Sequence, residues 1–361
     1  MHDTVNLFEQ LLDRLVEQQA SDLHLGAGRS ARWRVHGELL AMDTQPWTEG
    51  MLDALLQRLL GHTQADDFYA NGAADLGYST RSGERFRVNA FRTLGKAALV
   101  ARHLPAQFRS FTELRLPESI RQMAALSDGL VLVTGITGSG KSTTLATIIN
   151  EINEHRSAHI LSIEDPVEFV HSPKRALISH RELGTDVPDF ASAVKSAMRE
   201  DPDVILVGEL RDVDTMRAAL TAAETGHLVL STLHTADTSG AIERFVGAFP
   251  GEEQSVVRHR LSLVLRAVVA QQLLSLQSHA GRVAAVEVLQ VTPAVANLIA
   301  SGRTAQIYSA IESGRDVGMQ TFDHSLAMLA RDHLIAPEDG RRLARDTVGF
   351  ERLMRMGRTA A

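Results

Sequence analysis

Residues 135–142 have the types and spacing of a phosphate-binding loop. They read Gly-Ile-Thr-Gly-Ser-Gly-Lys-Ser and match the pattern G-x-x-x-x-G-K-[ST] at every position. Glycines let a backbone curl so that successive N–H groups point at an anion, and a following helix adds the positive end of its dipole. We therefore expect Lys141 to reach the β- and γ-phosphates of a nucleoside triphosphate, and the Ser142 hydroxyl to be a ligand of Mg²⁺. The predicted nucleotide-binding residues of this loop are Gly135, Ile136, Thr137, Gly138, Ser139, Gly140, Lys141, Ser142 and Thr143.

The segments on either side of the loop have the order that the motif requires. The apolar run 129–134 is typical of a buried strand, and residues 143–149 have the composition of a helix. A strand, a glycine-rich loop and a helix in succession distinguish a phosphate loop from a chance glycine-rich turn. The sequence thus predicts that the chain binds a nucleoside triphosphate near residue 140.

Two carboxylates follow the next predicted strand, His159–Ile163. They are Glu164 and Asp165. The carboxyl ends of parallel strands face the ligand crevice of an α/β sheet, so Glu164 can act as a general base toward water. A solvated acidic turn is the alternative for this segment.

A third strand, Val204–Val207, is followed by Gly208 and Glu209. In most phosphate-loop ATPases the acidic pair after this strand includes an Asp that supports Mg²⁺. Here Gly208 occupies that place, so Glu209 is the single carboxylate. We therefore expect Glu164 or Asp165 to complete the metal shell, which makes Ser142, Glu164 and Asp165 the predicted metal ligands.

The strand Leu228–Leu230 leads into a polar end that contains His234. A histidine there can sense the γ-phosphate or stabilise charge in the transition state, although a lone histidine is more often structural. Phosphoryl transfer also benefits from an arginine that arrives with closure or from a neighbouring subunit. Composition does not choose among the candidates, for which ordinary surface ion pairing is the alternative: Arg85, Arg87, Arg92, Arg102, Arg199 and Arg211.

Composition narrows the function classes. With 361 residues the chain suits two domains, and its formal net charge of −7 without a Lys/Arg block argues against a nucleic-acid partner. Because the chain has no cysteine, disulfides, thiol catalysis and cysteine-ligated zinc are excluded, which is typical of a cytoplasmic protein. No N-terminal signal is visible, and the longest apolar runs are far shorter than the ~20 residues of a membrane span. We expect no direct membrane insertion.

The pattern of apolar residues predicts two domains that position these groups. Residues 1–105 predict a small α+β domain, a helix-backed antiparallel sheet. Its predicted strands lie near 22–25, 31–35, 85–91 and 97–101, and its predicted helices are an opening helix that ends near Ala20 and a helix over 51–60. Residues 106–115 lack periodicity and are typical of a linker. Over 116–361 helices alternate with short apolar strands, which predicts a parallel, doubly wound sheet. After residue 250 the pattern is mainly helical, with one strand at 282–289.

Taken together, these segments resemble the secretion-type ATPases, and within them the PilT-like branch of pilus-retraction motors. The most specific stretches are Arg-Glu-Asp-Pro-Asp at 199–203, Gly-Glu-Leu-Arg-Asp at 208–212, Thr-Ala-Ala-Glu-Thr-Gly-His at 221–227 and Thr-Leu-His-Thr at 232–235. Residues 163–168 look like the Asp box of this family, 208–209 like its atypical Walker B segment and 233–235 like its His box. The resemblance covers nearly the whole chain.

The resemblance implies a homo-hexameric ring of two-domain subunits, each with a PAS-like N-terminal domain and a RecA-like ATPase domain. It implies that Glu164 is the catalytic base, that Glu209 is the Walker B carboxylate and that His234 senses the γ-phosphate. It further implies that Arg87 and Arg102 reach the nucleotide from the N-terminal domain. The implied cofactors are ATP and Mg²⁺, with Lys141 also essential for catalysis.

The implied activity is an ATP-driven motor of type IV pilus retraction and twitching motility. Such a motor is cytoplasmic and associates with the inner membrane through a pilus platform protein. One segment differs from the retraction branch, whose motif A-I-R-N-L-I-R-E is Ala-Val-Ala-Asn-Leu-Ile-Ala-Ser here, at 294–301. This difference keeps open an accessory ATPase that works with a second pilus ATPase, or a secretion or conjugation ATPase of the same superfamily. A nucleic-acid translocase is the least favoured alternative.

Overall fold

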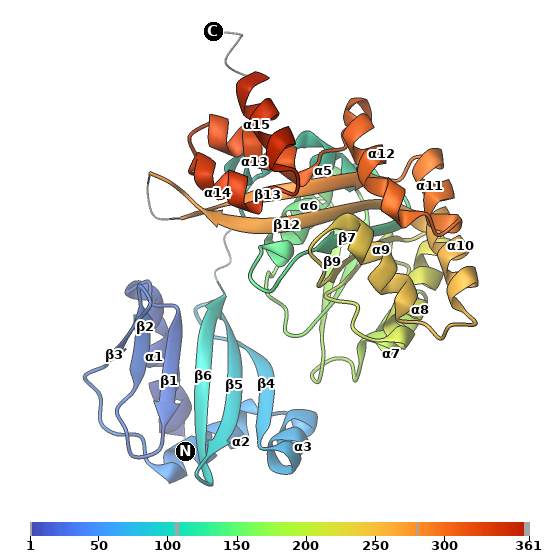
Figure 1. The fold of residues 1–361 in the computed structure, drawn as a ribbon. Helices are drawn as coiled ribbons and strands as arrows, with labels where there is room; N and C mark the ends of the chain where they lie inside the picture. Colours follow the sequence, from blue (N-terminus) through green and yellow to red (C-terminus); the bar gives the residue numbers. More distant parts are fainter. Residues whose placement is uncertain (1, 105–107, 279–280, 357–361) are drawn as a thin grey trace. The chain divides into compact units, whose positions relative to one another are not determined.

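The computed structural model describes residues 2–104, 108–278 and 281–356, and it divides into two compact units (Figure 1). Unit 1 comprises Met1–Gln107, Ile163–Val170 and His180–Phe190, and unit 2 comprises Phe108–Ser162, His171–Ser179 and Ala191–Ala361. Two segments from the middle of the chain thus belong to the first unit. Residues 106–107 of the predicted linker lie outside the described residues, and its remainder contains the helix α4 (Phe111–Leu114), which Ser110 and Glu113 begin with a capping box.

Unit 1 contains a six-stranded antiparallel sheet with the order β3-β2-β1-β6-β5-β4. Its strands are β1 (Asp22–Gly26), β2 (Arg32–Val35), β3 (Glu38–Ala41), β4 (Ala73–Ser79), β5 (Arg85–Thr93) and β6 (Lys96–Leu104). Its helices are α1 (His2–Glu17), α2 (Glu49–Leu59) and α3 (His62–Asn71). The predicted helix-backed antiparallel sheet is confirmed, although β3, β4 and α3 were not predicted.

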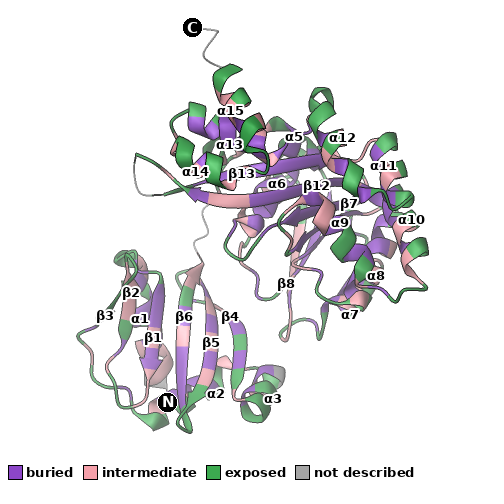
Figure 2. Cartoon of the chain, viewed as in Figure 1, coloured by how far each residue is buried: buried purple, intermediate pink, exposed green. Residues whose placement is uncertain are grey.

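The core of unit 1 forms because apolar residues recur at helical spacing in α1 and at every second position in β5. Leu11 and Leu15 of α1 belong to the same buried cluster as Phe86 and Val88 of β5. Buried and less buried residues alternate along β5 (Figure 2). Alternate side chains of a strand point to opposite faces, so one face of the sheet is left for polar residues. Arg85 and Arg87 belong to this polar set.

The second sheet has seven strands in the order β13-β12-β7-β11-β10-β8-β9. They are β7 (Gly129–Thr134), β8 (His159–Glu164), β9 (Leu177–Glu182), β10 (Val204–Val207), β11 (Leu228–Leu233), β12 (Leu265–Ser275) and β13 (Arg282–Gln290). The pairs β10–β11, β11–β7 and β7–β12 are parallel, and β13 is antiparallel to β12. Every residue of β7 and β11 is buried, as in strands covered on both faces. The predicted parallel sheet is confirmed.

Helices cover this sheet and continue beyond it (Figure 1). They are α5 (Glu118–Arg121), α6 (Lys141–His155), α7 (Phe190–Ala197), α8 (Val213–Glu224), α9 (Thr238–Gly247), α10 (Gln254–Val264), α11 (Pro293–Ala300), α12 (Ile307–Ser313), α13 (Phe322–Arg331), α14 (Pro337–Leu343) and α15 (Thr347–Met356), with short 3₁₀ turns at Gln122–Ala125, Thr304–Gln306 and Arg315–Val317. A separate apolar cluster includes Leu326 and Phe350 together with Leu274 of β12. In the part of the chain that the structure describes, no helix is long and apolar enough to cross a bilayer.

The prediction of a single strand after residue 250 was wrong. Among the residues after 250 that the structure describes there are two strands, because residues 265–275 form β12 in addition to β13. Most of this stretch is buried, and a mostly buried run has no period that distinguishes a strand from a core helix. The difference matters for function, because β12 lies next to β7, the strand that leads into the phosphate loop.

Candidate nucleotide-binding site

The predicted phosphate loop connects β7 to α6 in unit 2. Gly138 and Gly140 have φ values of +78° and +88°, a region that residues with a Cβ rarely adopt. Gly140 begins α6 without a side-chain cap, so the first N–H groups of the helix keep their capacity to bind an anion. The ammonium of Lys141 is buried and donates to the carbonyl oxygens of Gly135 and Ile136, at 2.9 and 3.1 Å.

The polar groups of the loop fit a phosphate. The Ser139 hydroxyl oxygen is buried and has no hydrogen-bond partner among the described residues. Buried polar atoms are almost always paired, so an isolated hydroxyl beside an uncapped helix start has the chemistry of an anion site. The loop therefore suits a nucleotide phosphate, as the sequence predicted.

Glu209 and His234 lie together beyond the carboxyl ends of two adjacent strands, β10 and β11. The Nε2 atom of His234 is 3.4 Å from Oε2 of Glu209, and Arg211 Nε lies 2.6 Å from the same oxygen. Register explains the proximity, since Val207 at the end of β10 pairs with Ser231 of β11. The structure thus brings together a carboxylate, an imidazole and a guanidinium, and Arg211 was only one of six arginine candidates in the sequence.

The segment that carries His234 is attached to the strand that carries the phosphate loop. Thr134, the last residue of β7, is paired with Leu233 in the sheet. Its hydroxyl donates to the carbonyl oxygen of Thr235 at 2.9 Å and accepts from the Thr235 N–H at 2.8 Å. A displacement of one segment therefore moves the other.

Sequence reasoning missed Gln271, a buried residue of β12. Its amide nitrogen donates to the carbonyl oxygen of Ser139, and its amide oxygen accepts from the Thr144 hydroxyl, both at 2.7 Å. A Cβ on Gly140 would lie 2.8 Å from the Gln271 amide nitrogen, so this glycine also permits the close approach. Gln271 thus fixes both the loop and the first turn of α6. No motif points to it, because its role depends on the pairing of β12 with β7.

Sequence reasoning also missed Glu287 of β13, whose side chain is buried. Its Oε1 atom accepts hydrogen bonds from the N–H and the hydroxyl of Thr238, at 3.0 and 2.7 Å. Burial raises the pKa of Glu287 above its ordinary value, while the hydrogen bonds from Thr238 act in the opposite direction. Thr238 begins α9, four residues after His234, so Glu287 anchors the far end of the histidine segment.

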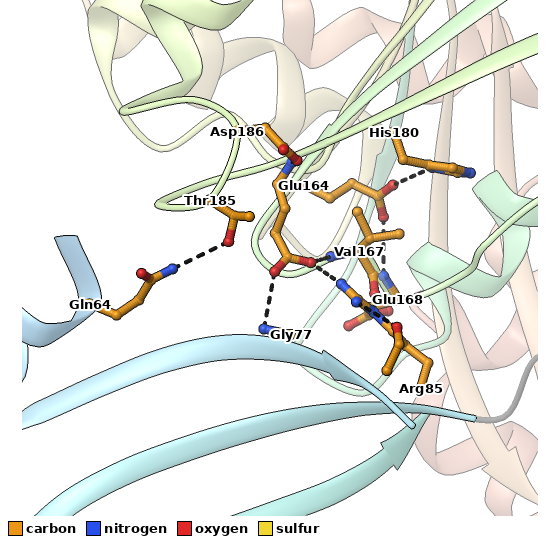
Figure 3. Close-up of polar contacts among 11 residues, drawn as sticks. Gln64, Gly77, Arg85, Glu164, Val167, Glu168, His180, Thr185 and Asp186 are labelled. Atoms are coloured by element: carbon orange, nitrogen blue, oxygen red, sulfur yellow. Dashed lines mark hydrogen bonds and ion pairs between the residues drawn. The ribbon is translucent and has the colours of Figure 1, made fainter. Parts of the chain in front are cut away.

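Four other predicted residues belong to unit 1, namely Glu164, Asp165, Arg87 and Arg102, whereas the arginine candidate Arg199 belongs to unit 2. Glu164 ends β8, its Oε2 atom accepts from the Glu168 N–H at 3.4 Å, and its Oε1 atom is 4.0 Å from Nδ1 of His180 (Figure 3). Asp165 follows it directly. The structure therefore groups Glu164 and Asp165 with the N-terminal sheet, and it groups residues 135–143 with Glu209 and His234 in unit 2.

Arg87 and Arg102 both form ion pairs within unit 1. Arg87 Nε lies 3.4 Å from Asp75 in a half-exposed pair, and Arg102 Nε lies 2.8 Å from the buried carboxylate of Asp22. Burial acts to raise the pKa of Asp22, but the Ser21 hydroxyl and the Arg102 guanidinium outweigh it and hold that pKa below its usual value. The Arg102 pair is consequently the more firmly held of the two.

Comparisons with known proteins identify the family of this chain. The family model described as type II/IV secretion system protein matches residues 2–331. The chain is 44% identical to the type IV pilus retractation ATPase PilT of Pseudomonas aeruginosa over 94% of this chain and 99% of that relative, and 46% identical to a twitching motility protein of Neisseria gonorrhoeae over 87% of this chain and 84% of that relative. A crystal structure of the pilus retraction motor PilT with bound ADP superposes with a TM-score of 0.86 at 38% identity, covering 95% of this chain and 98% of the other. The chain belongs to the type II/IV secretion system protein family.

Proposed function

We propose that this protein hydrolyses ATP and uses the released energy to drive type IV pilus retraction. The observation that carries the proposal is the complete phosphate loop, together with the Glu209–His234 pair at the neighbouring strand end. Relatives that match almost all of the chain are named for pilus retraction and twitching motility, which supports the choice of motor.

In the proposed reaction the residues of the loop bind and orient the triphosphate. Lys141 exchanges its hydrogen bonds with the Gly135 and Ile136 carbonyl oxygens for bonds with the β- and γ-phosphates. The N–H groups at the start of α6 donate hydrogen bonds to the negatively charged phosphate oxygens. The carboxylate of Glu164 takes a proton from water as the water oxygen bonds to the γ-phosphorus and the bond to ADP breaks. His234, held beside Glu209, senses and stabilises the γ-phosphate end.

The oxygen donors fit a hard cation. The Ser142 hydroxyl and the carboxylates of Glu164 and Asp165 are the ligand types that Mg²⁺ prefers, and the ion would neutralise the charge of the phosphates.

Arg87 and Arg102 are proposed to reach the nucleotide. Arg87 needs to leave only a half-exposed pair, which costs little, whereas Arg102 would leave a buried carboxylate behind. Arg87 is therefore the arginine that the proposal favours.

We further propose that the working assembly is a homo-hexamer that acts at the cytoplasmic side of the inner membrane through a pilus platform protein. A second candidate is an accessory motor that requires another pilus ATPase. It is favoured by the segment 294–301, because α11 keeps its helix with Val295 and Ile299 buried but carries no arginine.

The first test is phosphate release by the variant Lys141→Ala. Loss of the ammonium should lower turnover by about 100-fold or more, because the charge that develops on the γ-phosphate is no longer stabilised. Lys174→Ala, which removes an exposed lysine of unit 2, is the matched control and should keep wild-type turnover. Wild-type release by Lys141→Ala would reject the assignment of this loop.

The direction of the motor is tested by the surface phenotype of a deletion strain. Excess pili without twitching support retraction. Normal twitching together with loss of protein export would instead identify a secretion ATPase, and twitching restored by excess of another pilus ATPase would favour the accessory motor.

A further inference from the structure

A buried carboxylate outside the predicted site connects the Glu164 segment to the N-terminal sheet. Glu182 is the last residue of β9, and it is 6% exposed. Its Oε1 atom accepts from the Gly77 N–H of β4 at 3.1 Å, and its Oε2 atom accepts from the Val167 N–H at 3.2 Å. Glu182 also forms an ion pair with Arg85 of β5. One side chain thus joins β4, β5, β9 and the segment that follows Glu164.

The two members of the ion pair bind both backbone groups of Val167. The Val167 N–H donates to Glu182, and the Val167 carbonyl oxygen accepts from Arg85 Nε at 3.4 Å. Arg85 also donates from Nη1 to the Ser79 hydroxyl at 3.0 Å. Val167 is buried and lies three residues after Glu164, so the position of this short segment is set at Val167.

A glycine makes the arrangement possible. A Cβ on Gly77 would lie less than 3 Å from the Arg85 guanidinium and from both carboxylate oxygens of Glu182, so at least one of these groups would have to shift. Gly77 therefore admits the carboxylate to the backbone of β4. The turn that follows β9 makes a second contact within unit 1, since Gln64 donates to the Thr185 hydroxyl at 3.3 Å.

We propose that Glu182 is a positioning residue, which holds the segment 164–168 in place for catalysis and makes that position depend on β4 and β5. A buried ion pair adds little net stability compared with packed apolar side chains, because both charges lose their hydration. The pair between Glu182 and Arg85 is therefore better explained by orientation of the segment 164–168 than by stabilisation of the fold. The same strand end brings His180 to within 4.0 Å of Glu164. The inference rests on the proposed function insofar as Glu164 is the general base.

The experiment compares variants of the full-length protein in ATP turnover and in amide hydrogen exchange of residues 163–170. Glu182→Gln and Gly77→Ala should each lower kcat by about 10- to 100-fold, because small misplacements of a reacting group cost that much, with KM for ATP within about twofold. Exchange of 163–170 should rise by about tenfold or more as Val167 loses its partners. Arg85→Lys keeps the charge but cannot reach all of the partners of Arg85, so it should change kcat and exchange in the same direction as Glu182→Gln, by a smaller factor. This milder variant tests the proposal if the other two variants fold poorly.

Matched controls separate positioning from general damage. Gly26→Ala changes another strand glycine of the same sheet, one with no atom near its Cβ position, and Glu154→Gln removes an exposed ion pair with Lys174. Both should keep the wild-type kcat and exchange. In a Glu164→Gln background, Glu182→Gln should cause no further loss of kcat, because the two residues act together.

Three results would overturn the inference: an unchanged kcat in Glu182→Gln, unchanged exchange of 163–170, or a full additional loss in the Glu164→Gln background. Wild-type kcat in Glu164→Gln alone would contradict the proposed general base instead. In that case a lower kcat and faster exchange of 163–170 in Glu182→Gln still support positioning by Glu182, and unchanged values still overturn it.

Discussion

At the scale of single residues, the site depends on a few polar side chains, some held by neighbours in the chain and others by residues far away in the sequence. Lys141 is held by loop carbonyl oxygens, Glu209 by His234 and Arg211, and Glu287 by Thr238. Motif types identified the first two of these positions. Glu287 was not identified, because a glutamate in an apolar run such as 282–290 carries no signal of a partner 49 residues away.

The raised pKa of Glu287 leads to a prediction about stability and pH. Between the ordinary pKa of a glutamate and the raised folded value, the folded state holds a proton that the unfolded state has lost. The free energy of unfolding of the wild type should therefore decline as pH rises through this window, with a limiting slope of about 1.4 kcal/mol for each step of one in pH. Glu287→Gln cannot ionise, so its melting temperature relative to wild type should rise with pH, which thermal unfolding from pH 4 to 8 measures.

Glu243 is the control with the opposite sign. Hydrogen bonding to Arg258, the larger cause, and to Thr304 holds the pKa of Glu243 below its usual value. The contribution of Glu243 to the free energy of unfolding is present above the ordinary pKa of a glutamate and is lost as pH falls through its lower pKa in the folded state. Glu243→Gln should therefore be most destabilising near neutral pH. Parallel pH profiles for the two variants would contradict the assignment of Glu287.

At the scale of secondary-structure elements, the phosphate loop depends on β12 as much as on its own glycines. The sequence predicts the loop, its strand and its helix, because each is specified by local residue types. It does not predict the support from Gln271, since pairing of β12 with β7 unites residues that are more than 130 positions apart. The hydrogen bond from the Thr235 N–H to the Thr134 hydroxyl of β7 likewise joins residues that are far apart in the sequence.

Removal of this support should weaken nucleotide binding. In Gln271→Ala the Ser139 carbonyl and the Thr144 hydroxyl lose buried partners, at a cost of about 1–3 kcal/mol. We expect the dissociation constant for ATP to rise by about tenfold, as measured by isothermal titration calorimetry. Gln272→Ala, at the adjacent and more exposed position, is the control. Equal affinities of the two variants would show that β12 does not position the loop.

At the scale of the whole molecule, the two units do not coincide with two continuous stretches of the chain. Composition predicts a boundary near residues 106–115, yet segments 163–170 and 180–190 belong with the N-terminal sheet. Through Glu182 and Arg85, the unit that carries Arg87 and Arg102 also holds Glu164. The proposed catalytic residues are therefore carried by both units, Glu164 by unit 1 and Lys141 by unit 2.

The proposed hexamer predicts that inactive subunits inhibit active ones. Wild-type protein mixed with increasing fractions of Lys141→Ala should lose turnover more steeply than in proportion, because each ring then contains inactive copies that interrupt successive hydrolysis. Steady-state phosphate release measures the loss, and native mass spectrometry should find a mass six times the 39.4 kDa of the chain. A strictly linear loss of turnover, with the mass of a single chain, would contradict the ring.

The sequence by itself determined the fold class, the nucleotide chemistry and the identity of Lys141, Glu164, Glu209 and His234 as candidates. These follow from local patterns, since a phosphate loop and a buried strand that ends in a polar residue are specified by consecutive side chains. Only the tertiary structure assigned Gln271, Glu287 and Glu182 their partners and placed Glu164 with the N-terminal sheet. The physical reason is that strand pairing and burial join residues far apart in the chain, and no local spacing records which of them will meet.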